Sequence, residues 1–454
     1  MLSKQTNKFP EDVKNIWAAP DTSSHAENFS FKDFFPTIGS SLAERVKPCS
    51  NWLHTPNPSI GPNACMLTYF PREVVGPIEN RTLIKDPLTG EIRSMLMFGS
   101  NNYLGLTTHP DVREAAKRAI EEFGVGMGGP PLLNGMSSIH RQLEARIAQF
   151  KGAEDALLFA SGFQAQLGWV NGLLRDDDVL ICDELGHASL YDAIKLVSMG
   201  SRVRAFNFKH NDCDDLEQRL IKCKQVGGAS NRLIYVAVEG VYSMDGDLAP
   251  LPAIRELCHH YGAILVVDDA HGTGVMGKKG GGSDEHFGLK GRIDVTMGTF
   301  SKALGVTGGF LAASRDVIEY LRFFARSYMF SASLPAPVVA AVLAGLDVIE
   351  REPERISQLR ANSAYLLQQL QEAGFRASSD SAIIPVRIPA EVEIRTLAWR
   401  FHQEGIFVNS VEYPAVPLNA QRLRISVMAT HTREDLDTFI HVFQKLDREL
   451  GIIR

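Results

Sequence analysis

The chain has 454 residues, 44% of them hydrophobic and 22% charged, which is an ordinary composition for a globular protein and enough length for two or three lobes. Its net charge of −6 leaves no excess of Lys and Arg, so the composition excludes the basic surface that nucleic-acid binding needs. No stretch approaches the roughly eighteen consecutive apolar residues of a membrane span.

The six cysteines form neither a CxxC pair nor a metal-finger spacing. In a chain of this length the pattern indicates reduced, mostly buried thiols, and it predicts no metal site. The first residues lack the apolar core of a signal peptide. We therefore expect a cytoplasmic protein, while a peripheral contact with a membrane stays open.

Three regions follow one another along the chain. Residues 1–95 mix aromatic and Pro-rich pieces with polar turns, which indicates an N-terminal extension with short elements. In residues 96–335 short apolar runs alternate with amphipathic runs, a pattern typical of a mainly parallel sheet flanked by helices. Residues 336–454 continue with helical spacing and then a smaller α+β unit. The sequence therefore predicts an α/β protein with a large catalytic domain and a smaller C-terminal domain.

The elements themselves are predicted from periodicity and from Gly and Pro. Helices are expected over 109–123 and 139–150, each stopped by a glycine, and from 335 towards 374 with a break at Pro353. Strands are expected at 155–159, 178–182, 203–208, 233–238, 263–267, 295–297 and 309–312.

Two charged side chains follow neighbouring strand candidates. Asp268 ends the apolar run 264–268, and Lys302 lies 34 residues further on, after the run 295–297. Open α/β sheets bind ligands at the carboxyl ends of their strands. A desolvated lysine loses its proton readily and condenses with an aldehyde, while a carboxylate keeps a pyridine nitrogen protonated. The pair predicts a pyridoxal 5'-phosphate site, with Lys302 as the Schiff-base lysine and Asp268 as the pyridinium partner.

Other residues suit the rest of this cofactor. Ser161, Gly162 and Phe163 stand where a strand turns into a helix, a position that offers backbone donors to a phosphate, and Thr299 and Ser301 add hydroxyl groups. His187 can stack on the pyridine ring, and His271 can reach its phenolic oxygen.

Simpler interpretations compete with each of these assignments. His187 and His271 could be structural histidines, and a metal site at Asp268 and His271 lacks a third ligand. The glycine patterns at 124–129 and 272–277 fit GxGxxG, but neither lies between a strand and a helix as dinucleotide binding requires. The second pattern nearly forms a P-loop, yet Lys279 stands where magnesium needs Ser or Thr.

Four motifs carry a more specific signal, namely GSNNYLGL at 99–106, EGVYSMDGD at 239–247, DDAHGTG at 268–274 and TFSK at 299–302. They resemble the α-oxoamine synthases, which include 8-amino-7-oxononanoate synthase, 2-amino-3-ketobutyrate CoA ligase, 5-aminolevulinate synthase and serine palmitoyltransferase. The resemblance covers roughly residues 95–454. Within the family, the segments MLMFGSNNY at 95–103 and FSASLP at 330–335 are most similar to the bacterial serine palmitoyltransferase-like members.

The resemblance implies the fold of the type I pyridoxal-phosphate transferases, which is aspartate aminotransferase-like. It implies the same roles for Lys302, Asp268 and His187. It adds His271 and Ser243 near the cofactor's phenolic oxygen, and Asn101 and Arg424 at the substrate carboxylate, where a planar guanidinium suits bidentate binding. Arg424 could instead form a structural ion pair. Ser331 matches a position that reaches the phosphate from the neighbouring subunit, which implies a homodimer with the active site at the subunit interface.

The implied reaction is the decarboxylative condensation of a small amino acid with an acyl thioester, giving an α-amino ketone. The first expectation is serine with a long-chain acyl-CoA, as in sphingolipid biosynthesis, with glycine, alanine or a carrier-protein thioester left open. One departure concerns the thioester: Pro131 stands in the glycine-rich stretch 124–135 where many members have an arginine.

Other functions remain as alternatives. An 8-amino-7-oxononanoate synthase or 2-amino-3-ketobutyrate CoA ligase activity fits the same family, and an aminotransferase fits the same fold. A catalytically silent partner of such an enzyme is disfavoured because Lys302 is retained.

Overall fold

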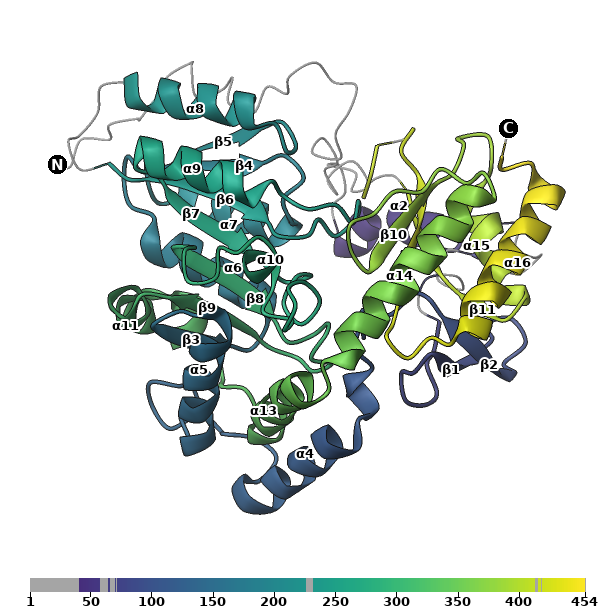
Figure 1. Cartoon of the computed structure of the whole chain (residues 1–454), viewed down its shortest axis with the longest axis horizontal. Coiled ribbons are helices and arrows are strands. Elements are labelled where there is room, and N and C mark those ends of the chain that lie inside the picture. Colours follow the sequence, from purple (N-terminus) through teal and green to yellow (C-terminus); the bar gives the residue numbers. More distant parts are fainter. Residues whose placement is uncertain are drawn as a thin grey trace.

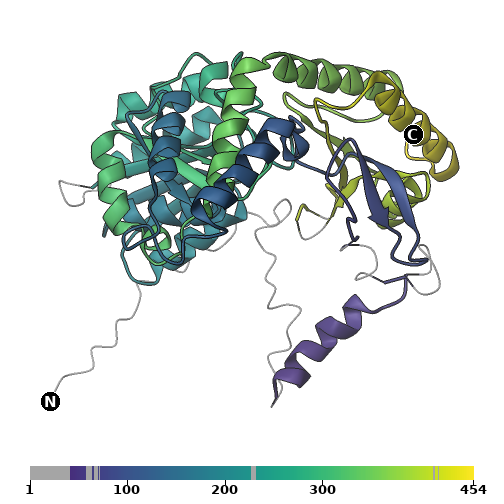
Figure 2. The same cartoon turned by 90° about the horizontal axis from the view of Figure 1, so that it is seen from below.

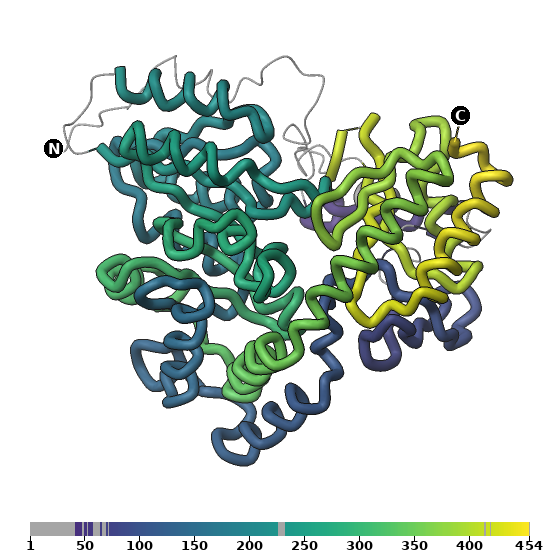
Figure 3. The backbone as a smooth tube through the Cα atoms, in the orientation of Figure 1, coloured from purple at the N-terminus to yellow at the C-terminus, as the bar shows by residue number. Residues whose placement is uncertain are grey.

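The structure is a computed structural model that describes residues 41–57, 64–65, 70, 72–225, 232–412, 415–417 and 419–453. The first 40 residues of the predicted N-terminal extension lie outside the described residues. Figure 1 shows a larger lobe that contains the main sheet and a smaller lobe that contains the C-terminus. The tube in Figure 3 passes from the larger to the smaller lobe where α13 (Ala336–Arg351) leads into α14 (Glu354–Glu372).

The larger lobe is built on a seven-stranded sheet of order β3-β9-β8-β7-β6-β4-β5. Strands β4 to β8 run parallel to one another, and β9 is antiparallel to both of its neighbours. The bounds are β3 (Asp155–Phe159), β4 (Val179–Asp183), β5 (Arg204–Phe208), β6 (Ile234–Glu239), β7 (Ile264–Asp268), β8 (Val295–Thr299) and β9 (Gly309–Ala313). The predicted strands and the mainly parallel sheet are thereby confirmed.

Helices cover both faces of this sheet, which explains why the central strands are apolar on both sides. One face packs against α6 (Gly162–Leu173), α7 (Ala188–Ser198), α11 (Arg315–Phe324) and α12 (Arg326–Met329). The other packs against α8 (Cys213–Gln225) and α9 (Leu251–Tyr261). The helices α5 (Ser138–Lys151) and α10 (Ser283–His286) complete the lobe.

The long helical pattern after residue 335 forms two helices, and the predicted break at Pro353 is confirmed because this residue is the N-cap of α14. The helix α13 packs beside α4 (Pro110–Phe123), which follows the short helix η3 (Leu106–Thr108). A second sheet of order β10-β13-β12 comprises β10 (Ile383–Arg387), β12 (Asn409–Val411) and β13 (Arg422–Ser426). The helices α14 and α15 (Ile394–Gln403) contact it, and α16 (Arg433–Leu450) packs against both of them.

A third sheet pairs strands that precede the large sheet in the sequence with a strand of the C-terminal region. Its strands are β1 (Arg81–Lys85), β2 (Ile92–Met97) and β11 (Ile406–Phe407), with β2 between the other two. Residues 81–97 therefore belong with the smaller lobe, and β2 spans the boundary predicted between residues 95 and 96. The helix α2 (Leu42–Leu53) lies apart from the sheets in Figure 2. Among the described residues, no helix has both the length and the apolar character to span a membrane.

Candidate active site

The predicted pair lies at the carboxyl edge of the large sheet. Asp268 is the last residue of β7, and Lys302 lies three residues beyond the end of β8, the strand beside it. On the other side of β7, Glu239 ends β6 in register with Asp268. Because parallel strands bring their carboxyl ends to one edge, an amine and two carboxyl groups converge there.

Burial and mutual charge change the pKa values of all three groups. Burial disfavours the ammonium form of Lys302 and lowers its pKa to about 8, although Asp268 and Glu239 oppose this effect. Burial raises the pKa of Asp268, while the Lys302 amine and the Ala270 backbone N–H, which donates to Asp268 Oδ1 over 3.0 Å, act in the opposite direction. Burial also raises the pKa of Glu239 well above its usual range. The site thus holds a lysine that loses its proton far more readily than a surface lysine.

The predicted phosphate residues meet at the start of α6. Ser161 is the N-cap of this helix, and its hydroxyl accepts a hydrogen bond from the Gln164 N–H over 3.2 Å. Thr299 packs closely against Gly162, because a Cβ added to Gly162 would lie 3.0 Å from the Cβ of Thr299. The Thr299 and Ser301 hydroxyls are 2.9 Å apart. A helix N-terminus and two hydroxyl groups therefore form one donor-rich surface, on which the Phe163 side chain is partly exposed.

His187 lies at the start of α7 beside the carboxyl edge. It is the N-cap of that helix, and its Nδ1 atom accepts from the Ser189 N–H over 3.2 Å and lies 2.8 Å from the Ser189 hydroxyl. Burial lowers its pKa, and the Lys302 charge acts in the same direction while Asp268 opposes it. His187 and Asp268 line one small cavity, so the predicted stacking residue is brought to the predicted pyridinium partner.

A hydrogen-bond network brings the predicted substrate residues to His271. Arg424 Nη1 donates to Asn101 Oδ1 over 3.2 Å, and the Tyr103 hydroxyl donates to the same oxygen over 3.1 Å. The Tyr103 oxygen lies 2.9 Å from His271 Nδ1. Arg424 Nε donates to the Ser243 carbonyl oxygen over 2.6 Å, which ties Ser243 to the network through its backbone.

Burial sets the charge states within this network. It lowers the pKa of His271 well below its usual range, and Lys302 and Arg424 add to the effect, so His271 is neutral. Arg424 is 7% exposed, and among the described residues it donates hydrogen bonds to a carbonyl, an amide and a hydroxyl oxygen rather than to a carboxylate. The buried guanidinium therefore keeps its charge available for an anion.

Ser331 lies near the phosphate surface of its own chain. Its hydroxyl accepts from the Gln164 side-chain amide over 2.9 Å, and Gln164 belongs to the first turn of α6. The predicted reach of Ser331 to a neighbouring subunit stays a prediction.

The glycine pattern at 272–277 has a packing role. Asp269 is fully buried, and its carboxylate accepts from Lys151 over 2.7 Å and from the Ser283 hydroxyl over 2.5 Å. A Cβ on Gly272 or on Gly282 would lie 2.0 Å from an Asp269 oxygen, so only glycine fits beside it. The pattern therefore closes a loop around a buried carboxylate, in agreement with the rejection of a P-loop.

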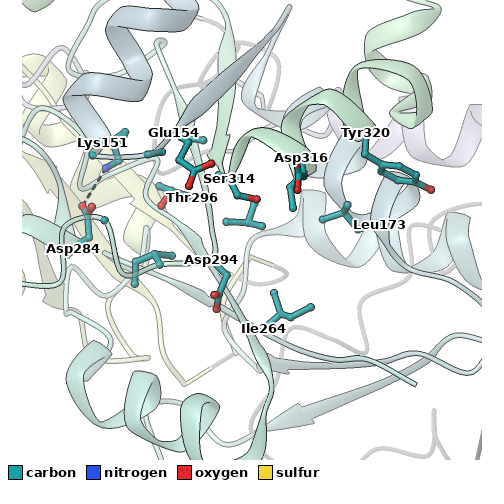
Figure 4. Close-up of a pocket in the computed structure, with 18 of the residues that line it drawn as sticks. Lys151, Glu154, Leu173, Ile264, Asp284, Asp294, Thr296, Ser314, Asp316 and Tyr320 are labelled. Atoms are coloured by element: carbon teal, nitrogen blue, oxygen red, sulfur yellow. Dashed lines mark hydrogen bonds and ion pairs between the residues drawn. The ribbon is translucent and has the colours of Figure 1, made fainter. Parts of the chain in front are cut away.

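A broad cavity opens at the opposite edge of the sheet, beside the amino ends of β6, β7 and β8. Figure 4 shows Lys151 and Asp284 paired at one end of it and Tyr320 at the other. None of the predicted site residues lines this cavity. Among the described residues, no cluster of three or more His, Cys, Asp or Glu side chains could hold a metal ion, and the five cysteines described are free thiols.

Sequence reasoning gave no role to three residues at or beside the site. Tyr103 and Glu239 lie within the motifs quoted above, and a polar residue at the end of a buried strand was the signal for Glu239. His210 lies in the loop after β5, where its Nδ1 atom is 3.0 Å from Asp183 and its Nε2 atom 2.8 Å from Asp247. It therefore joins the end of β4 to the loop that carries Ser243.

Replacing His210 with glutamine is expected to destabilise the protein by about 1.5–3 kcal/mol at pH 7, because hydrogen bonds to charged groups are lost. Burial disfavours the charged ring, but the two carboxylates raise the pKa of His210 from 6.5 to about 10. The ion pair therefore contributes fully below pH 6.5 and is lost as the pH rises through 10. Urea unfolding at pH 7 and above pH 10 should show the difference between wild type and variant shrinking. The exposed His259→Gln variant should show no such trend.

The comparisons with known proteins agree with this geometry. Residues 93–443 match the family model for aminotransferase class I and II. The 8-amino-7-oxononanoate synthase of Symbiobacterium thermophilum is 41% identical over 383 residues, which are 84% of this chain and 94% of that protein. The chain belongs to the α-oxoamine synthase family. It is a fold type I enzyme that uses pyridoxal phosphate to condense an amino acid with an acyl thioester.

Solved structures of the family are similar throughout. The serine palmitoyltransferase of Sphingomonas wittichii superimposes with a TM-score of 0.81 at 31% identity, covering 91% of this chain and 100% of that one. A serine palmitoyltransferase variant from S. paucimobilis with a bound PLP–myriocin aldimine gives a TM-score of 0.78 at 32% identity, covering 85% and 94%. The recognition of the α-oxoamine synthases, of fold type I and of pyridoxal phosphate is thereby confirmed.

Proposed function

We propose that Lys302 carries the pyridoxal phosphate of this α-oxoamine synthase and that Asp268 keeps its pyridine nitrogen protonated. The observation that carries the proposal is the convergence of this amine and this carboxyl group at the ends of β7 and β8. The Lys302 pKa of about 8 supports it, because only the uncharged amine reacts with an aldehyde.

The other predicted residues fit the remaining groups of the cofactor. Ser161, Gly162 and Phe163 offer backbone N–H groups at the start of α6 for the phosphate, with Thr299 and Ser301 beside them. His187 is held at the rim by Ser189 and suits stacking on the ring. Neutral His271 suits a hydrogen bond to the phenolic oxygen, with Ser243 nearby. Ser331 completes the set in a homodimer.

When bound, pyridoxal phosphate supplies an electron sink that stabilises negative charge on the substrate α-carbon. The chain itself binds, orients and moves a proton. Arg424 and Asn101 hold the amino-acid carboxylate, and their shared hydrogen bond fixes the guanidinium plane. Lys302, once displaced by the substrate amine, is the base that takes the α-proton. His271 is kept in place by Tyr103.

The comparisons favour one substrate pair through the name 8-amino-7-oxononanoate synthase. The S. thermophilum protein and the Geobacter sulfurreducens protein, which are 41% and 42% identical to this chain, both have this name. A nine-carbon product with its amino group on C8 and its ketone on C7 derives C8 and C9 from alanine. The acyl partner then has seven carbons and a terminal carboxylate. We infer this reaction as the first candidate for the chain.

A second candidate rests on the glycine-rich stretch 124–135. It holds no Lys or Arg, and Pro131 stands where many members of the family have an arginine. A terminal carboxylate needs a cation to replace its water, whereas an apolar chain does not. The lack of a cation in this stretch favours serine with a long-chain acyl thioester, the reaction named by the serine palmitoyltransferase structures.

A two-way substrate panel distinguishes the candidates. Alanine, serine and glycine are each combined with acyl-CoA and acyl-carrier thioesters of seven to sixteen carbons, with and without a terminal carboxylate, and free thiol and product mass are measured. Alanine with the seven-carbon diacid thioester should give the highest kcat/KM under the first candidate. Serine with a long apolar thioester should do so under the second. Turnover with a 2-oxo acid and no thioester would instead reveal an aminotransferase.

The pH dependence of cofactor uptake tests Lys302 directly. The rate at which the apo-protein takes up pyridoxal phosphate should rise with pH and level off above about 8, because the reactive free amine accumulates through that pKa. Stopped-flow absorbance between pH 6.5 and 10 measures it, with a Lys302→Ala variant as the blank. A rate that keeps rising to pH 10 would show that the reactive amine is an ordinary surface lysine.

A further inference from the structure

A small cavity lies against Asp268 on the side of α6. Gln166 and Trp169 line it from that helix, Glu239 from the end of β6, and His187 from the start of α7. The space is sufficient for about one water molecule. It therefore adjoins the proposed pyridinium partner.

Three buried polar atoms of this lining have no hydrogen-bond partner within the described part of the chain: Gln166 Oε1, Trp169 Nε1 and Glu239 Oε1. Their residues are 2%, 0% and 4% exposed, so bulk solvent does not reach them. Buried polar atoms are nearly always hydrogen-bonded, because a missing bond leaves their desolvation uncompensated. Three such atoms on residues that line one cavity point to a shared polar ligand.

The chemistry of the three atoms matches a single water. The indole N–H of Trp169 is only a donor, whereas the Gln166 and Glu239 oxygens are acceptors. A water can accept one hydrogen bond from the indole and donate one to each oxygen, which makes the three bonds typical of an internal water. A cation would be repelled by the indole N–H donor, and an anion would be repelled by the two acceptor oxygens.

We propose that this cavity binds one internal water, which ties Gln166 and Trp169 of α6 to Glu239 and so supports Asp268 beneath the cofactor. The proposal rests on the proposed roles of Lys302 and Asp268.

The consequence concerns two carboxyl groups below the ring. Glu239 pairs in register with Asp268, so two carboxyl groups lie on neighbouring strands. Burial raises the pKa of both carboxyl groups, that of Glu239 well above its usual range, while the Lys302 charge opposes the effect on each. The water fixes the Glu239 carboxyl group in one orientation, and its loss should disturb the cofactor through Asp268.

A crystal structure of the holoenzyme tests the site itself. Density for one water within hydrogen-bond distance of Gln166 Oε1, Trp169 Nε1 and Glu239 Oε1 is expected. An empty cavity, or a direct hydrogen bond between Gln166 and Glu239, would overturn the proposal.

Matched tryptophan variants test its effect. Trp169→Phe removes the indole donor at nearly constant shape, and the dissociation constant for pyridoxal phosphate should rise roughly three- to tenfold. The pH midpoint of the bound cofactor's absorbance should shift as well. Trp399 of α15 is also buried with an unpartnered indole nitrogen among the described residues, so Trp399→Phe is the control and should change neither quantity.

A second variant guards against a folding defect. Gln166→Met removes an acceptor at similar length and should also raise the dissociation constant, with the thermal midpoint measured for every variant. Equal cofactor binding by wild type, Trp169→Phe and Gln166→Met would contradict the proposal. Borohydride reduction and peptide mapping separate the two hypotheses: a label on Lys302 without the water removes this inference alone, whereas a label elsewhere removes the proposed function.

Discussion

Replacing Lys302 with alanine is expected to lower turnover by at least about a thousandfold, because one amine both carries the cofactor and takes the α-proton. Borohydride reduction of the wild-type holoenzyme should place a covalent label on the peptide that contains Lys302. The variant should show no label there, although it can still bind pyridoxal phosphate through its phosphate. Steady-state thiol release and mass spectrometry of the digested protein measure the two results.

Two features of the chain make this test specific. Lys278 lies in the glycine-rich loop that resembles a P-loop and is exposed, so Lys278→Ala should retain wild-type turnover and labelling. Burial disfavours the ammonium form of Lys302, so the variant should keep its thermal midpoint. Multiple turnovers by Lys302→Ala at a rate within tenfold of wild type would contradict the assignment.

The sequence predicted those parts of the site that depend on strand ends. Apolar runs of strand length are easily located, and the run 295–297 predicts β8 (Val295–Thr299) closely. Once two such runs are taken as parallel neighbours, Asp268 and Lys302 must share one edge. The helix start at Ser161 follows from the same logic, since a strand must turn into a helix there.

Contacts between distant segments were not available from local patterns. Asn101 and Arg424 are hydrogen-bonded although 323 residues separate them, and only the resemblance had assigned both to the substrate. The pairing of β2 with β11 likewise joins residues 96 and 406, which no periodicity connects. The sequence did not indicate a role for Glu239, because many buried strands end in a polar residue. Its importance follows from its register with Asp268, which only the structure shows.

The loop that follows Asp268 contains the glycine pattern that resembles a P-loop. In the structure, a buried charge cluster holds this loop in place. Lys151, the last residue of α5, donates to Asp269 over 2.7 Å, to Asp284 over 3.2 Å and to the Gly281 carbonyl over 2.5 Å. Lys151 is 2% exposed. Burial opposes its charge, but the two carboxylates raise its pKa, so it is an ammonium ion. One cation thus fixes both ends of the segment 269–284, which carries His271.

Replacing Lys151 with methionine is therefore expected to destabilise the protein by roughly 3–5 kcal/mol, because two buried carboxylates lose their counter-ion. Urea unfolding at pH 7 measures the change, and the exposed Lys195→Met variant should stay within about 0.5 kcal/mol of wild type. Adding Asp269→Asn to Lys151→Met should recover part of the loss, because one uncompensated charge is removed with it. A Lys151→Met protein as stable as wild type would mean that the carboxylates are neutral, and the His271 loop would then be held by its hydrogen bonds and glycine packing alone.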